Sequence, residues 1–205
     1  MANDIGKPDF LYHLQHFLQS QLPADLDASS SLVFCIPDKI SVFSTAVATF
    51  YAPSNLCRTG GMHHKCIHAV TSWRHGKPQH DCVFTNTDKL KPGMHGLSVV
   101  PVRLFFSVTM KCVKYPCALV HWYSLVRDSP NENTGIWVIE QDILDNGKPW
   151  TAVIYLDSIL HLAHLLPIYG DKQAPRDMKY MDSLDIFEEF YINQFADNHA
   201  FEIAF

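Results

Sequence analysis

The sequence predicts a mainly β (α+β) protein whose strands form a small antiparallel, SH3-like, partly open barrel with flanking N- and C-terminal helices. First, residues 99–140 hold runs rich in Val, Phe, Tyr and Trp that alternate with short polar turns. Second, about seven or eight such runs recur along the chain at spacings of roughly ten residues. Third, strands do not alternate with helices, as they would in a parallel sheet.

The chain of 205 residues divides into an N-terminal helix and linker, residues 1–31, and a single β-rich domain with a C-terminal helix, residues 32–205. A chain of this length can bury the core of one compact domain. Hydrophobic residues make up 47% of the chain and charged residues 18%. This balance is typical of globular proteins and excludes a mainly disordered chain.

The first predicted element is an amphipathic helix over residues 9–22, because its apolar residues recur at spacings of three and four and Pro23 ends it. One or two strands are expected within residues 32–51. Residues 63–70 (HHKCIHAV) are a short helix candidate, and residues 81–87 (DCVFTNT) read as a strand.

After the central runs, the turn signal Asp145-Asn146-Gly147 precedes a predicted strand over residues 151–156. We expect a turn at residues 156–159 and then a strand as far as Tyr169, because Pro167 is unfavourable inside a helix.

The C-terminal part is expected to form a helix over residues 182–195. Asp182 or Ser183 would cap this helix, and its apolar stripe would be Leu184, Phe187, Tyr191 and Phe195. Residues 199–205 (HAFEIAF) are apolar enough to close the sheet as a last strand.

Histidines and cysteines concentrate between residues 57 and 82, and zinc favours such ligands in sets of four. The cluster comprises Cys57, His63, His64, Cys66, His68, His75, His80 and Cys82. The candidate ligands of a zinc ion are His63, His64, His68, His80 and Cys82. Against this hypothesis, the segment has no CxxC pair and no HExxH. Surface histidines and packed thiols are the simpler interpretation.

No arrangement of residues predicts a catalytic centre. Asp81, Asp88, Asp142 and Asp157 are possible Mg²⁺ ligands, yet they stand at ordinary turn and cap positions. The chain lacks the GxSxG elbow that carries the catalytic serine of many hydrolases. Gly60-Gly61 is not followed by the GK[ST] of a phosphate-binding loop. We therefore predict no catalytic residue and no required cofactor.

Four aromatic residues near the core allow a different kind of site. Trp122, Tyr123, Trp137 and Trp150 could form a cage for a methylated lysine or a platform on which bases stack. Core packing is the simpler interpretation of at least Trp122 and Trp137.

The charge and the cysteines of the chain indicate which partners it can bind and in which cellular compartment it is found. The net charge of −5 argues against broad nonspecific phosphate binding, although residues 58–91 are locally basic. The sequence contains no secretory signal and no apolar run of about 18 residues, so we expect an intracellular protein with no membrane partner. The six cysteines are expected to stay as free thiols.

Six runs distributed along nearly the whole chain resemble the C-terminal region of Plavaka-type transposase-like proteins of mushroom-forming fungi. These runs are ATFYAPSNLCRTGGMHH (48–64), SWRHGKPQHDCVFTNTD (72–88), GLSVVPVRLFFSV (96–108), YPCALVHWYSLVRDSPNENTGIWVIE (115–140), AVIYLDSILHLAHLLPIYG (152–170) and FYINQFADNHAFEIAF (190–205). The chain departs from the family's pattern at His64, Lys65 and Cys66, where the family tends to carry Arg or Glu.

The resemblance implies a non-catalytic accessory module of a transposase-like protein, located in the nucleus, that mediates protein or DNA contacts. The family's DNA-cutting carboxylates belong to an upstream RNase-H-like domain that nothing in this sequence matches. Candidate DNA contacts are Arg58, Lys65, Arg74 and Lys77. Two alternatives stay open: a metal-dependent zinc hydrolase or nuclease built on the His/Cys cluster of residues 57–82, and a chromatin-reader-like small barrel.

Overall fold

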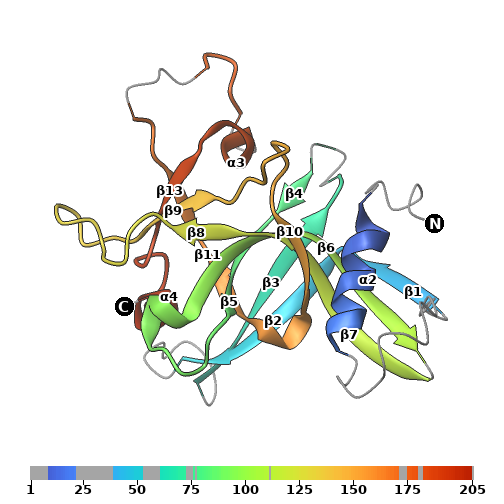
Figure 1. Cartoon of the computed structure of the whole chain (residues 1–205). Coiled ribbons are helices and arrows are strands. Elements are labelled where there is room, and N and C mark those ends of the chain that lie inside the picture. The colour runs from blue at the N-terminus through green and yellow to red at the C-terminus, as the bar shows by residue number, and fades with distance from the viewer. Residues whose placement is uncertain are drawn as a thin grey trace.

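The computed structural model describes residues 9–21, 39–52, 61–72, 76, 78–110, 112–170, 175–179 and 182–204 (Figure 1). The described chain is mainly β, as predicted, and its strands form one ten-stranded and one three-stranded antiparallel sheet. The sheets do not close into a barrel. The predicted linker after the first helix lies outside the described residues.

The long strand β6 (Leu97–Met110) organises the larger sheet. One of its edges pairs with β5 (Cys82–Asn86) and β1 (Lys39–Phe43), and the other pairs with β7 (Val113–His121) and β8 (Tyr123–Leu125). Val and Phe side chains dominate β6, and most of its residues are buried. Large β-branched and aromatic side chains suit a strand that is covered on both faces.

The remaining strands of the larger sheet extend from these neighbours. They are β9 (Val138–Gln141), β10 (Thr151–Tyr155), β11 (Ile159–Ala163), β12 (Leu165–Pro167) and β13 (Glu189–Ile192). The sheet order runs β10, β7, β6, β8, β9, β13, β12, with β11 paired to β5. The short 3₁₀ helix η3 (Leu156–Ser158) separates β10 from β11, which confirms the predicted strand and turn. The strand predicted as far as Tyr169 is instead divided into β11, which pairs with β5, and β12, which pairs with β13 and ends at Pro167. A second 3₁₀ helix, η2 (Gly93–Gly96), leads into β6.

The smaller sheet contains β2 (Thr45–Tyr51), β3 (Met62–Val70) and β4 (Gln79–His80). The helix predicted over residues 63–70 is therefore wrong, because this segment lies within β3. It pairs with β2 over seven consecutive residue pairs, from Thr45 opposite His68 to Tyr51 opposite Met62. These long-range backbone hydrogen bonds override the weak local tendency to form a helix.

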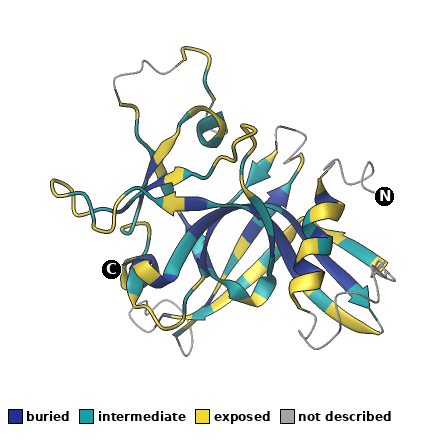
Figure 2. Ribbon diagram, in the orientation of Figure 1, coloured by how far each residue is buried: buried dark blue, intermediate teal, exposed yellow. Residues whose placement is uncertain are grey.

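The N-terminal helix α2 (Phe10–Ser20) confirms the prediction for this region and packs against the larger sheet (Figures 1 and 2). Phe10 meets Phe106 of β6 with ring centroids 4.9 Å apart, and Phe17 meets Tyr155 of β10 at 4.8 Å. Apolar residues at spacings of three and four place these rings on one buried face of the helix.

The C-terminal part differs from the sequence prediction. In place of one helix over residues 182–195, the chain forms a short α3 (Ser183–Ile186) and then β13. The predicted last strand is the helix α4 (Asn198–Ile203), which Asp197 caps by accepting a hydrogen bond from the Ala200 backbone N–H at 2.8 Å. Phe190 and Ile192 are almost fully buried, and their alternation fits a strand paired on both edges better than the predicted helical stripe.

Candidate functional site

Trp122 lies between β7 and β8. On the side of the sheet next to it, β9 ends and β10 begins. Extending the registers of the two flanking strand pairs by one residue places both Asp142 and Trp150 opposite Trp122. Three backbone hydrogen bonds close this arrangement. The Trp122 N–H donates to the Trp150 carbonyl at 2.9 Å, the Trp150 N–H to the Asp142 carbonyl at 2.7 Å, and the Asp142 N–H to the Trp122 carbonyl at 3.0 Å. We call these three residues the Trp122 junction.

Between β9 and β10, a hairpin of residues 143–149 leaves the sheet after Asp142 and returns at Trp150. Ile143 and Pro149 form an isolated antiparallel bridge, and the Leu144 N–H donates to the Lys148 carbonyl at 2.9 Å. Gly147 has a φ of +76°, a conformation that glycine adopts without strain. The turn predicted from Asp145-Asn146-Gly147 is therefore present, and it holds Asp142 and Trp150 next to each other.

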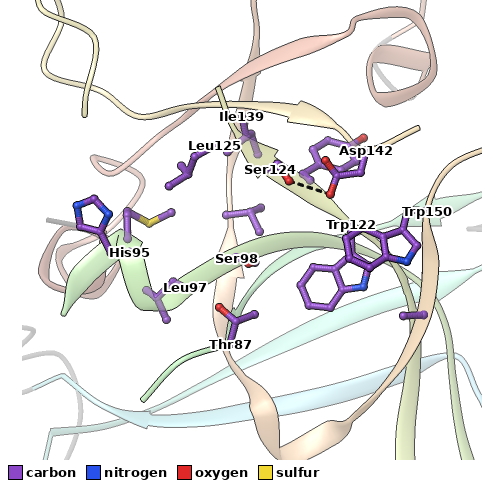
Figure 3. A pocket seen from close by; sticks show the side chains of 14 residues that line it. Thr87, His95, Leu97, Ser98, Trp122, Ser124, Leu125, Ile139, Asp142 and Trp150 are labelled. Carbon is purple, nitrogen blue, oxygen red and sulfur yellow. Dashed lines mark hydrogen bonds between the residues drawn. The ribbon is translucent and has the colours of Figure 1, made fainter. Parts of the chain in front are cut away.

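A pocket of about 560 Å³ opens at the Trp122 junction (Figure 3). Residues directly opposite each other on paired strands carry their side chains on the same face of a sheet. The indole rings of Trp122 and Trp150 accordingly lie side by side, with centroids 5.8 Å apart and planes inclined by 38°. Trp150 is 48% exposed, so part of this aromatic pair is accessible to a ligand.

The pocket carries one carboxylate. The Asp142 carboxylate accepts a hydrogen bond from the Ser124 hydroxyl at 2.9 Å (Figure 3). Of the described residues that line the pocket, none is Lys or Arg. His95 lies on the far side of the pocket from the indoles in this view, and its ring packs edge-on against Trp137 at 5.4 Å. The pocket therefore combines apolar aromatic surface with negative charge.

Tyr123, which lines the pocket, and Cys82, in the core cluster behind it, are neutral at physiological pH. Tyr123 is 3% exposed, and burial together with the nearby Cys82 raises the pKa of its phenol. Burial likewise raises the pKa of the Cys82 thiol to about 12. Neither Tyr123 nor Cys82 is therefore poised to exchange a proton near neutral pH.

The four aromatic residues singled out in the sequence separate into two groups. Trp122, Tyr123 and Trp150 line the pocket, although Tyr123 is almost fully buried. Trp137 is 7% exposed and belongs to the hydrophobic core. Sequence reasoning missed the position of Asp142 beside the indoles. The usable signal was its place immediately before the segment that contains the Asp145-Asn146-Gly147 turn, with Trp150 at the other end.

The five zinc candidates occupy different environments. His63 and His64 are neighbours on β3, where His63 is buried and His64 is exposed and hydrogen-bonded to Thr49 at 2.9 Å. His68 pairs with Asp81 at 2.9 Å, and His80 lies in β4. Cys82 is buried in the core cluster that includes Tyr123. Among the described residues, no three His, Cys, Asp or Glu side chains lie close enough together to hold a metal ion.

The carboxylates considered as Mg²⁺ ligands have separate local roles. Asp81 also accepts a hydrogen bond from Gln79 at 3.0 Å. Asp88 accepts one from the Leu90 backbone N–H at 3.0 Å, and Asp157 lies in η3. Asp142 lies at the Trp122 junction, so the four carboxylates occupy four separate places in the fold.

Three histidines instead meet around Phe50, which the sequence does not reveal. The Phe50 ring contacts His63 at 5.9 Å, His161 at 4.5 Å and His199 at 4.5 Å, measured between centroids. Burial lowers the pKa of both His161 and His199. Because β2, β3, β11 and α4 each contribute one ring, only the tertiary structure brings this histidine cluster together.

Of the candidate DNA contacts, Lys65 is the one whose surroundings the structure describes. Its ammonium forms an ion pair with the Asp197 carboxylate. Arg58, Arg74 and Lys77 lie outside the described residues, as do Cys57 and His75 of the His/Cys cluster. Lys65 would therefore have to exchange this partner in order to contact a phosphate.

None of the helices in the described ranges is long and apolar enough to cross a membrane. The chain matches no protein-family model, and neither curated proteins nor solved structures yield a match to it.

Proposed function

We propose that this chain is a non-catalytic binding module that contacts a partner protein by receiving one of its cationic side chains at the Trp122 junction. The observation that carries the proposal is the placement of Asp142 and Trp150 opposite Trp122, which sets two indoles and one carboxylate around a single opening. This role agrees with the accessory module of a transposase-like protein that the sequence resemblance implies.

The chemistry of the pocket favours a cation over an anion or a neutral group. A cation over the face of a Trp ring gains about 0.5–1 kcal/mol when exposed and about 2 kcal/mol when desolvated. The Asp142 carboxylate adds attraction of the same sign. None of the described residues that line the pocket is Lys or Arg, so the ligand's charge has no such competitor there.

Lysine, methylated lysine and arginine all present a cation that fits this description. If the pocket binds methylated lysine more tightly than lysine or arginine, the module is similar to a chromatin reader. An SH3-like arrangement of the strands around the pocket stays a prediction of the sequence, as does location in the nucleus.

The proposal is tested with two small probes of almost the same shape. Choline carries a quaternary ammonium group, and 3,3-dimethylbutanol replaces its nitrogen by carbon. Binding is followed through the indole N–H signals in NMR spectra. We expect choline to bind about 5- to 30-fold more tightly than the neutral probe, which corresponds to about 1–2 kcal/mol. Peptides with lysine, trimethyllysine or arginine then rank the natural cations.

Matched variants connect the effect to the Trp122 junction. Trp150→Ala is expected to weaken choline binding about tenfold, and Asp142→Asn several-fold. Asp128→Asn removes the same charge at an exposed position outside the hairpin, and Tyr51→Ala removes an exposed aromatic ring from β2. Both controls should bind as the original chain does. Equal affinity for the two probes would contradict the proposal.

Contact with DNA would give a different pattern. If duplex DNA binds with a steep loss of affinity at rising salt concentration and Trp150→Ala has no effect, phosphate contacts and not the pocket carry the function.

A further inference from the structure

We propose that a second cavity, between the beginning of α2 and the hairpin of residues 143–149, is a binding site for an oxyanion, either a carboxylate or a phosphate, held by Arg103. The cavity has a volume of about 490 Å³. It shares no lining residue with the pocket at the Trp122 junction, although the hairpin that positions Trp150 also forms part of its wall.

A β-bulge determines the position of Arg103. Val102 pairs with Val120, but Leu104 pairs with Leu119, so β6 has one more residue than β7 at this point. That extra residue is Arg103. A bulge bends its strand and redirects a side chain that a regular strand would hold elsewhere, and bulges are over-represented next to binding sites. Here Arg103 lines the cavity together with Leu119 and His121 of β7.

The guanidinium of Arg103 has no counter-ion in the described part of the chain. No described carboxylate forms an ion pair with it, and its Nε is buried without a hydrogen-bond partner. Its charge acts on Tyr123 and Cys82, but both groups have raised pKa values and are neutral. Buried donors nearly always have a partner in folded proteins, so an unpartnered one calls for an explanation. A bound oxyanion supplies the missing acceptor.

The other charged and titratable groups around the cavity are compatible with an anion. Asp9 is the one carboxylate among the described lining residues, and Lys148 neutralises it with an ion pair of 3.0 Å. His13 and His121 also line the cavity. Burial lowers the pKa of His13, which therefore offers a neutral N–H donor near pH 7. Arg103 is the cation left over, and its planar fork matches a carboxylate or phosphate.

The experiment measures the melting temperature of the full chain in sodium phosphate, sodium acetate and sodium chloride at equal pH and ionic strength. A ligand that binds only the folded state raises this temperature. Phosphate also stabilises proteins by exclusion from their surface, so the informative quantity is the shift relative to Arg103→Met. We expect a shift of a few degrees in phosphate or acetate that Arg103→Met abolishes. The salt with the larger Arg103-dependent shift identifies the oxyanion.

Two further variants make the outcome decisive. Arg127→Met removes an exposed arginine from the loop after β8 and should keep the full shift. Arg103→Lys keeps the positive charge but loses the planar guanidinium, and it should retain only part of the increase in melting temperature. Should Arg103→Met not fold, chemical shift changes at His121 and Thr151 on titration with phosphate and acetate provide the readout in the original chain. Equal shifts in the original chain and Arg103→Met, or none in either salt relative to chloride, would overturn the proposal.

Discussion

The ammonium of Lys65 on β3 forms an ion pair with the carboxylate of Asp197, the residue that caps α4. The two residues lie 132 positions apart in the chain. The same carboxylate accepts the hydrogen bond of the Ala200 N–H, and one of its oxygens lies 3.6 Å from Nε2 of the buried His161. A single side chain thus connects the C-terminal helix to the smaller sheet and to β11.

Asp197→Ala is expected to destabilise the fold by about 1–3 kcal/mol. The loss of an N-cap costs about 0.5–2 kcal/mol, and the partly exposed ion pair adds no more than about 1 kcal/mol. Lys65→Met removes only the ion pair and should lower the free energy of unfolding by less than about 1 kcal/mol. Urea unfolding measures the stability of both variants. Asp128→Ala, at an exposed loop position, is the control and should change stability little. Equal effects of Asp197→Ala and Asp128→Ala would contradict the role of the cap.

Acid is expected to destabilise the histidine cluster around Phe50. Burial lowers the pKa of His161 and His199 in the folded state, whereas the unfolded chain takes up protons near pH 6.5. The unfolded state therefore binds more protons below that pH, and stability falls as the pH decreases from about 7 to 5. Each histidine contributes at most about 1.4 kcal/mol per pH unit.

Matched glutamine variants isolate this effect in urea unfolding at pH 7.5 and 5.5. His199→Gln should reduce the pH dependence, while His16→Gln, on the exposed side of α2, should leave it unchanged. Asp197 does not interfere in this range: burial opposes a low pKa, but hydrogen bonds from Lys65 and Ala200 still lower it, so its contribution is lost only in stronger acid. An unchanged pH dependence in His199→Gln would show that the cluster is not responsible.

Gly147→Ala tests whether the hairpin turn positions the pocket. Gly147 and Gly135 both have positive φ and open space where a Cβ would lie, so alanine at either position should cost about 1 kcal/mol. The two variants should differ in choline binding, because only the hairpin of Gly147 places Trp150 opposite Trp122. Gly147→Ala is expected to weaken binding and Gly135→Ala is not. A similar loss in both variants would mean that the turn has no special role.

The cysteines should differ in reactivity toward a thiol reagent in the folded protein. Cys66 and Cys112 are exposed, whereas Cys82 and Cys117 are buried with pKa values raised to about 12, mainly by burial. Because the thiolate is the reactive form, Cys66 and Cys112 should be modified first and Cys82 and Cys117 only after unfolding. Peptide mapping by mass spectrometry identifies the order. Fast modification of Cys82 at neutral pH would contradict its burial.

The sequence predicted correctly those elements whose local pattern and tertiary environment agree. The helix α2 has apolar residues at helical spacing, and the sheet receives that same face. β5 and β10 carry apolar residues of high strand propensity between turns, and the structure buries most of β5 and leaves β10 mostly half-buried. The prediction failed for residues 63–70 and 182–195, where the local pattern is ambiguous and pairing with distant strands decides between helix and strand.

By itself, the sequence determined the predominance of β structure, the N-terminal helix and the turn at Asp145-Asn146-Gly147, because each depends on residues that are neighbours in the chain. Only the tertiary structure decided which side chains meet: Trp122 with Asp142 and Trp150, and the histidines around Phe50. These contacts follow from the registers of strands that pair across the sheets. A register is set by how the apolar faces of both strands fit the core and by the turns that join them, and residues from distant parts of the chain take part in that fit.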